Sequence, residues 1–146
     1  MAFQPLYPHL INVSPTIPEY RTSVWEKGGL VYVNAGYLTI CGADPALIYG
    51  VSVRSGQNGA SDGTYSTEVY MLDPDSLFIG KSNTTTALTQ VGVAYGVVLS
   101  GTEWLVDISD TQNTRVRVIA LDPRDAVGTS GGRYYVRFTQ ANIQTF

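Results

Sequence analysis

The sequence predicts an all-β fold, either a small antiparallel β-barrel or a two-sheet sandwich, with an extended N-terminal arm. Short runs of β-branched and aromatic residues, separated by Gly, Asn and Asp, recur from residue 30 onwards, and such runs are typical of strands. Only residues 84–91 resemble a helix, which Gly92 would close, and three consecutive threonines weaken that prediction. About seven to nine strands with almost no helix pack as a barrel or a sandwich.

The first 23 residues are expected to form an arm with an extended backbone. They contain four of the seven prolines, and each proline fixes φ, lacks an N–H and disfavours helix in the preceding residue. Because an extended apolar segment cannot bury itself, we expect residues 1–23 to dock on another surface, either their own body (residues 24–146) or a neighbouring chain. The candidate partner-binding residues are the apolar ones interleaved with these prolines: Phe3, Leu6, Tyr7, Leu10, Ile11, Val13, Ile17 and Tyr20. Deleting residues 2–20 is expected to leave a folded body.

Five short strands are expected in the first half of the body, at residues 30–33, 37–41, 46–55, 67–72 and 77–81. The strand at 46–55 would place alternate residues on one face, namely Leu47, Tyr49, Val51 and Val53. It leads into a loop rich in Gly, Ser and Asn at residues 55–63, which we expect to be mobile.

Four closing strands are expected at residues 95–100, 103–109, 115–121 and 133–139. Their alternation is clear: Trp104, Val106 and Ile108 share one face of the second of these strands. A single inward face on successive short strands predicts an antiparallel meander.

Charge is distributed unevenly along the chain. Residues 1–110 carry four bases and ten acids, whereas residues 111–146 carry five arginines and two acids. If the last two strands are neighbours, the like charges on their outward faces need compensation. The outward-facing arginines concerned are Arg115, Arg117, Arg133 and Arg137. We expect Glu103 and Asp107 on an adjoining strand to provide it, and an acidic partner is the alternative.

No catalytic motif is present, so we expect a protein that is not an enzyme and has no cofactor or metal. The single histidine, His9, lies in the arm, where no scaffold positions it against a nucleophile. The single cysteine, Cys41, follows an apolar run and is expected to be a buried core residue. A net charge of −3 with 14% charged residues is too weak to indicate a nucleic-acid partner. Without a signal peptide or a long apolar run, we expect a soluble protein with no membrane partner.

The arm, the short all-β body, the low charge and the lack of catalytic groups resemble the decoration, or cement, proteins of tailed-bacteriophage heads. The final segment is similar to the closing strands of small phage head proteins with a barrel body, through Gly96-Val97-Val98-Leu99, Trp104-Leu105-Val106-Asp107 and Gly132-Arg133-Tyr134-Tyr135-Val136-Arg137-Phe138. The resemblance implies a structural virion protein, made in the host cytoplasm and bound to the capsid exterior. It would bind as a homo-oligomer, with a trimer favoured, and clamp neighbouring major capsid protein subunits against internal DNA pressure.

A carbohydrate-binding module of a phage tail or surface appendage is the alternative. The chain has ten tyrosines and two tryptophans, whose faces stack on sugar rings, and aromatic residues near the loop at 55–63 would make the contacts. Most tyrosines alternate with Val and Leu in strands, however, where packing explains them without a ligand.

Overall fold

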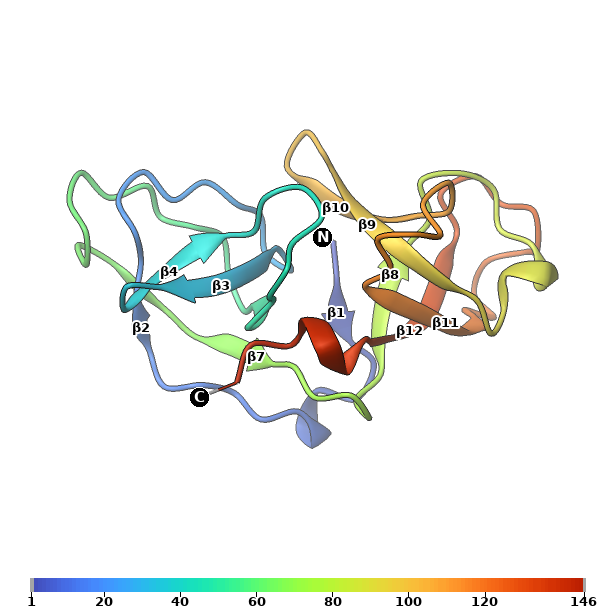
Figure 1. The fold of residues 1–146 in the computed structure, drawn as a ribbon, viewed down its shortest axis with the longest axis horizontal. Coiled ribbons are helices and arrows are strands. Elements are labelled where there is room, and N and C mark those ends of the chain that lie inside the picture. Colours follow the sequence, from blue (N-terminus) through green and yellow to red (C-terminus); the bar gives the residue numbers. More distant parts are fainter. Residues whose placement is uncertain (1, 146) are drawn as a thin grey trace.

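The computed structural model describes residues 2–145. The strands form a six-stranded sheet, a four-stranded sheet and a two-stranded ribbon (Figure 1). Strand accounts for 39% of the chain and helix for 6%. Every strand pair within the sheets is antiparallel. The all-β prediction is confirmed, with one curled, half-barrel sheet and a sandwich-like arrangement of the two sheets.

The elements follow one another in this order: β1 Gln4–Pro5, η1 Pro8–Leu10, β2 Ile17–Pro18, β3 Leu30–Asn34, β4 Tyr37–Ile40, β5 Gly50–Ser52, β6 Ser66–Thr67, β7 Val69–Met71, β8 Phe78–Lys81, η2 Leu88–Gln90, β9 Ala94–Ser100, β10 Glu103–Asp107, β11 Val116–Leu121, β12 Arg133–Phe138 and η3 Gln140–Asn142. The three η elements are single 3-10 turns. In Figure 1 the six-stranded sheet lies at the right and the four-stranded sheet at the left, with β1 between them.

The six-stranded sheet has the order β1-β8-β12-β11-β9-β10 and curls back on itself. The chain just after β8 meets β10, where Ser82 bridges Val106 and the Asn83 N–H donates to the Val106 carbonyl at 3.0 Å. The expected meander is wrong, because β9 separates β10 from β11 and β12 pairs with β8. The connection between β10 and β11 is long enough to pass β9, whereas β9 and β10 are joined by a tight turn at Gly101.

The four-stranded sheet has the order β4-β3-β5-β7, and the ribbon of β2 and β6 lies beside it. The expected long strand at 46–55 is wrong, since only Gly50–Ser52 is a strand and Leu47 is exposed. Gly50 explains the close pairing that remains, because a Cβ there would lie 2.1 Å from Cγ1 of Val69 in β7. Residues before it turn away toward the other sheet, where Arg115 Nε donates to the Pro45 carbonyl at 2.5 Å.

The expected helix at residues 84–91 is also wrong, because only the single turn η2 forms. The backbone of Thr86 instead forms hydrogen bonds with the loop that precedes β12. Its N–H donates to the Thr129 carbonyl at 3.1 Å, and its own carbonyl accepts from Gly128 at 2.9 Å. Backbone groups engaged with a distant loop cannot make the i→i−4 bonds of a helix.

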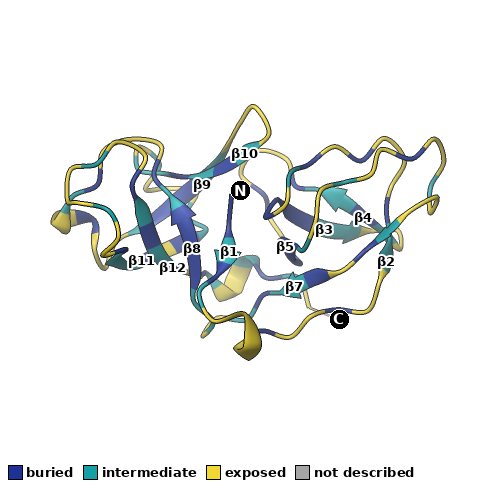
Figure 2. Ribbon diagram, turned by 180° about the vertical axis from the view of Figure 1, so that it is seen from behind, coloured by how far each residue is buried: buried dark blue, intermediate teal, exposed yellow. Residues whose placement is uncertain are grey.

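The largest core cluster joins the two sheets, and the buried strands stand out from the exposed loops in Figure 2. Trp104, Tyr134, Phe3 and Phe78 are its bulkiest fully buried side chains. Cys41 belongs to this cluster and is 2% exposed, which confirms the prediction of a buried cysteine. Burial raises the pKa of its thiol to about 12, so the thiol stays protonated at neutral pH.

Residues 2–23 lie along their own body and cross from one sheet to the other (Figure 1). Near the start, Gln4 in β1 pairs with Ile79 in β8. Further along, Ile17 in β2 pairs with Thr67 in β6. The segment from η3 onwards crosses in the same way. The Gln144 side-chain amide accepts a hydrogen bond from the Val33 N–H at 2.8 Å and donates one to the Val33 carbonyl at 2.9 Å. Both segments therefore hold the two sheets together.

Candidate docking surface

The eight predicted partner-binding residues fall into three groups. Phe3 and Ile11 are buried in the protein's own core, at 0% and 8% exposure. Leu6 and Ile17 are half-buried. The remaining four are exposed and available to a partner: Tyr7 at 48%, Leu10 at 67%, Val13 at 45% and Tyr20 at 39%. The extended backbone expected for residues 1–23 is interrupted by the turn η1 and by a turn at residues 21–22, where Thr22 has a φ of +55°.

Pro8 positions two of the exposed side chains. It stands at the start of η1, where its fixed φ suits a helical turn and its missing N–H is not needed. The Leu10 N–H donates to the Tyr7 carbonyl at 3.0 Å and the Ile11 N–H to the Pro8 carbonyl at 3.2 Å. The turn thus presents Tyr7 and Leu10 outward while Ile11 anchors it in the core.

A hollow of about 260 Å³ lies beside this turn. It is lined by Tyr7, Leu10 and Ile11 from the arm and by Asp75, Ser76 and Leu77 from the turn that precedes β8. Sequence reasoning missed the contribution of Leu77, because only the pairing of β1 with β8 brings position 77 beside the arm. The hollow therefore belongs jointly to the arm and to the body.

Asp73 stiffens the wall of that hollow. Its Oδ1 accepts the N–H groups of Asp75 and Ser76, at 2.8 and 2.9 Å, and the Ser76 hydroxyl donates to its other oxygen. Burial opposes ionisation of this carboxyl, but the three hydrogen bonds outweigh it and lower the pKa. Asp73 therefore closes its own turn, as Asp does in many turns.

The arginines of the closing strands are not compensated as the sequence predicted. Glu103 pairs with Lys81 at 3.3 Å, and Asp107 accepts a hydrogen bond from Asn83 at 2.9 Å. Arg115 instead donates to the backbone carbonyls of residues 44 and 45, at 3.1 and 2.5 Å. Arg133 pairs with Asp125 at 2.8 Å. Within residues 2–145, Glu103 and Asp107 thus form no ion pair with these arginines.

The two acids of the last segment form a network with two arginines. The buried Asp122 carboxylate accepts from Arg124 and lies 3.8 Å from Arg133, which forks onto Asp125 with bonds of 2.8 and 2.9 Å. The hydrogen bonds from Arg133 lower the pKa of Asp125 to about 2. The bond from Arg124 likewise lowers the pKa of Asp122, against the opposing effect of burial. The network holds residues 122–133 in place.

This network predicts an acid-dependent loss of stability. A depressed carboxyl pKa contributes stability that is complete above the unfolded value, 3.8, and is lost as the pH falls through the folded value, about 2 for Asp125. We expect Asp125→Asn to unfold at lower urea than the wild type at about pH 6, and the difference to shrink at about pH 3. Asp75→Asn, an exposed acid outside the network, is the control. An equal difference at both pH values for Asp125→Asn would contradict the prediction.

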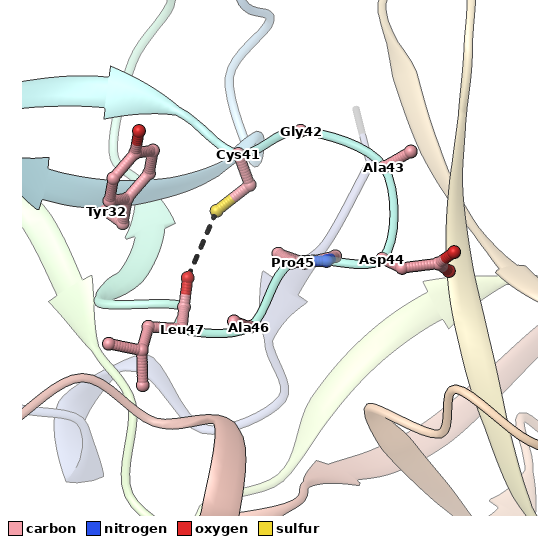
Figure 3. Close-up of a pocket in the computed structure, with 8 residues that line it drawn as sticks. All are labelled: Tyr32, Cys41, Gly42, Ala43, Asp44, Pro45, Ala46 and Leu47. Atoms are coloured by element: carbon pink, nitrogen blue, oxygen red, sulfur yellow. Dashed lines mark hydrogen bonds between the residues drawn. The ribbon is translucent and has the colours of Figure 1, made fainter.

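A second hollow, of about 360 Å³, lies between Tyr32 and residues 41–47 (Figure 3). Cys41 donates to the Leu47 carbonyl at 3.7 Å, and the Asp44 side chain points away from both Tyr32 and Cys41. Within the part of the chain that the structure describes, no group of three or more His, Cys, Asp or Glu residues is placed to hold a metal ion. In the same part, no helix has the length and apolarity to span a membrane.

The loop at residues 55–63 is tied to the arm. The Thr22 N–H donates to the Gly59 carbonyl at 2.8 Å, and Asn58 donates to the Ser23 carbonyl at 3.1 Å. Glu19, which sequence reasoning did not single out, is 2% exposed, and its carboxylate accepts from the Gln57 N–H at 3.0 Å. A buried carboxylate must be hydrogen-bonded, so Glu19 fixes the loop against the arm.

Comparison with known proteins found no match for the chain, so a functional proposal depends on the surface described above. No family model matches the chain, and no curated protein or solved structure matches it either. The exposed side chains of Tyr7, Leu10 and Val13, with the hollow beside η1, form the candidate docking surface.

Proposed function

We propose that the chain is a structural protein that binds another protein through its docking surface, the exposed side chains of Tyr7, Leu10 and Val13 with the adjoining hollow. Following the resemblance to phage decoration proteins, the partner is a major capsid protein on the outside of a phage head. One observation carries the proposal: Leu10 is 67% exposed on a turn that is anchored on both sides. Scattered exposed apolar side chains are normal, but an aromatic and aliphatic group around a hollow is typical of interaction sites.

Preorganisation supports this role. An arm that is free in solution would lose about 1–2 kcal/mol of backbone entropy per residue on docking. Here β1 and β2 already hold the arm on the body, so that cost falls on folding and not on binding. Many copies on one shell, as trimers or otherwise, would then multiply a modest affinity.

The test replaces Leu10 with glutamate and measures cosedimentation with expanded phage heads. A buried charge at the interface is expected to weaken binding by about tenfold or more. Leu88→Glu is the matched control, because Leu88 also lies in an exposed 3-10 turn, at 69% exposure, on a different part of the surface. Both variants should keep the wild-type unfolding midpoint. Equal binding of Leu10→Glu and the wild type would refute the docking role of this surface.

One observation favours the carbohydrate-binding alternative. Tyr65 and Tyr20 are 44% and 39% exposed beside the loop at 55–63. Next to them, Arg21 lies 5.6 Å from the Tyr20 ring centroid and 3.4 Å from Asp62. Aromatic faces beside polar groups suit a sugar ring. Glycan-array binding that Tyr65→Ala abolishes and Leu10→Glu leaves intact would favour this function over the capsid role.

A further inference from the structure

Two exposed arginines stand directly opposite each other on the outer face of the six-stranded sheet. Arg117 in β11 and Arg137 in β12 are Cα partners in the antiparallel register. Their side chains project from the same face, because Val116, Val118, Val136 and Phe138 on either side of them are buried on the other. Like charges directly opposite each other destabilise a strand pair.

No acidic group among the described residues neutralises this pair. Arg117 donates to the Gly92 carbonyl at 2.6 Å, and this acceptor carries no charge. Within residues 2–145, neither Arg117 nor Arg137 lies within an ion-pair distance of a carboxylate. Asp122 and Asp125, the two acids of the closing segment, are engaged by Arg124 and Arg133.

The arginine pair belongs to a row of cross-strand neighbours that runs across the six-stranded sheet to the docking surface. Across the sheet, Arg117 is opposite Ala94 on one side and Arg137 on the other. Val136 pairs with Phe78, so Arg137 falls beside Leu77 on the outer face. The Leu6 N–H donates to the Leu77 carbonyl at 3.0 Å and extends the row to the arm. Leu77 also lines the hollow beside η1.

We infer that the docking surface extends from Tyr7 and Leu10 through Leu77 to Arg137 and Arg117, and that its partner is a protein surface that presents carboxylates next to an apolar side chain. This inference rests on the proposed function and specifies the chemistry of its partner. The apolar side chain would fill the hollow, while Asp or Glu residues would accept hydrogen bonds from the two guanidinium groups. Arginine beside apolar anchors is a common composition at interaction sites.

Charge complementarity is the reason for choosing an acidic partner. A carboxylate placed between the two guanidinium groups would turn their mutual repulsion into two charge-assisted bonds. Asp75 places an acidic side chain in the lining of the hollow, at that end of the row. It would disfavour a partner acid inside the hollow and so direct the partner's acids toward the arginines.

The test uses labelled poly-L-glutamate as the carboxylate probe, with binding followed by fluorescence anisotropy at low salt. We expect the double variant Arg117→Gln/Arg137→Gln to bind about tenfold more weakly than the wild type. Arg21→Gln/Arg54→Gln removes the same charge from exposed arginines elsewhere and should change the affinity by less than about twofold. The unfolding midpoint of the first double variant should equal or exceed that of the wild type, because a repulsive pair is removed.

Two results would overturn the inference. One is equal weakening by both double variants, which would mean that the probe senses only net charge. The other is tighter binding of single-stranded DNA than of poly-L-glutamate through the same two arginines, which would assign the pair to a nucleic acid. Failure of the proposed function would look different, because it would appear as full cosedimentation of Leu10→Glu with phage heads and leave the poly-L-glutamate result unchanged.

Discussion

Phe3→Ala is expected to lower the free energy of unfolding by about 3–5 kcal/mol, the range for removing a buried phenylalanine ring. Phe3 is 0% exposed and its ring makes an edge contact with Phe138 at 5.3 Å between centroids. Gly80 makes room for it, since a Cβ there would lie 2.4 Å from Cε1 of Phe3. Urea unfolding followed by tryptophan fluorescence measures the loss.

Two controls isolate the effect of the buried ring. Leu10→Ala changes an exposed side chain of the same segment and should alter the unfolding free energy by less than about 0.5 kcal/mol. Phe3→Leu keeps much of the buried volume and should cost less than Phe3→Ala. A Phe3→Ala protein as stable as the wild type would show that the ring is not part of the core in solution.

Deleting residues 2–20 is expected to prevent cooperative folding. The sequence alone suggested that this truncation leaves a folded body, but Phe3, Ile11 and Glu19 are buried in that body. Their loss would open the core between the two sheets. It would also leave β8 and β6 without their hydrogen-bonded partner strands, β1 and β2. We expect weak near-ultraviolet circular dichroism and a broad thermal transition for the truncated chain.

A peptide of residues 2–20 provides the control for this truncation. If the segment acts through its contacts with the body, the added peptide should restore a cooperative transition, and a Phe3→Ala peptide should not. A truncated chain that unfolds as sharply, and at the same temperature, as the full chain would contradict the prediction.

Strand positions could be predicted from the sequence because local patterns determine them. The runs around Leu30, Phe78 and Trp104 are rich in β-branched and aromatic residues, and each became a strand within a few residues of its expected bounds. Turn residues were equally informative, as at Gly101, which has a φ of +63°. What these signals share is that they act over a few neighbouring residues.

Strand order and the contacts of the arm could not be predicted, because they depend on residues far apart in sequence. Nothing near Phe3 indicates that Gly80 leaves a space for its ring. Nothing near Arg117 indicates that Arg137 will be its cross-strand partner, or that Glu103 will instead face Lys81. The sequence does predict part of the docking surface, because Tyr7 and Leu10 are apolar residues of the Pro-rich arm and both are exposed. Leu77 and the two arginines required the pairing of the sheet.

The crossing segments also affect how the protein must fold during synthesis. The Gln144 side chain reaches Val33, 111 residues earlier, and the Phe3 ring rests on Phe138. The union of the two sheets therefore waits until residues 138–144 have left the ribosome. A topology with so many distant pairings folds slowly for its size, and the nascent chain exposes its apolar strands throughout this wait. Yield in a host should therefore respond more to chaperone supply and growth temperature than the stability of the finished protein would suggest.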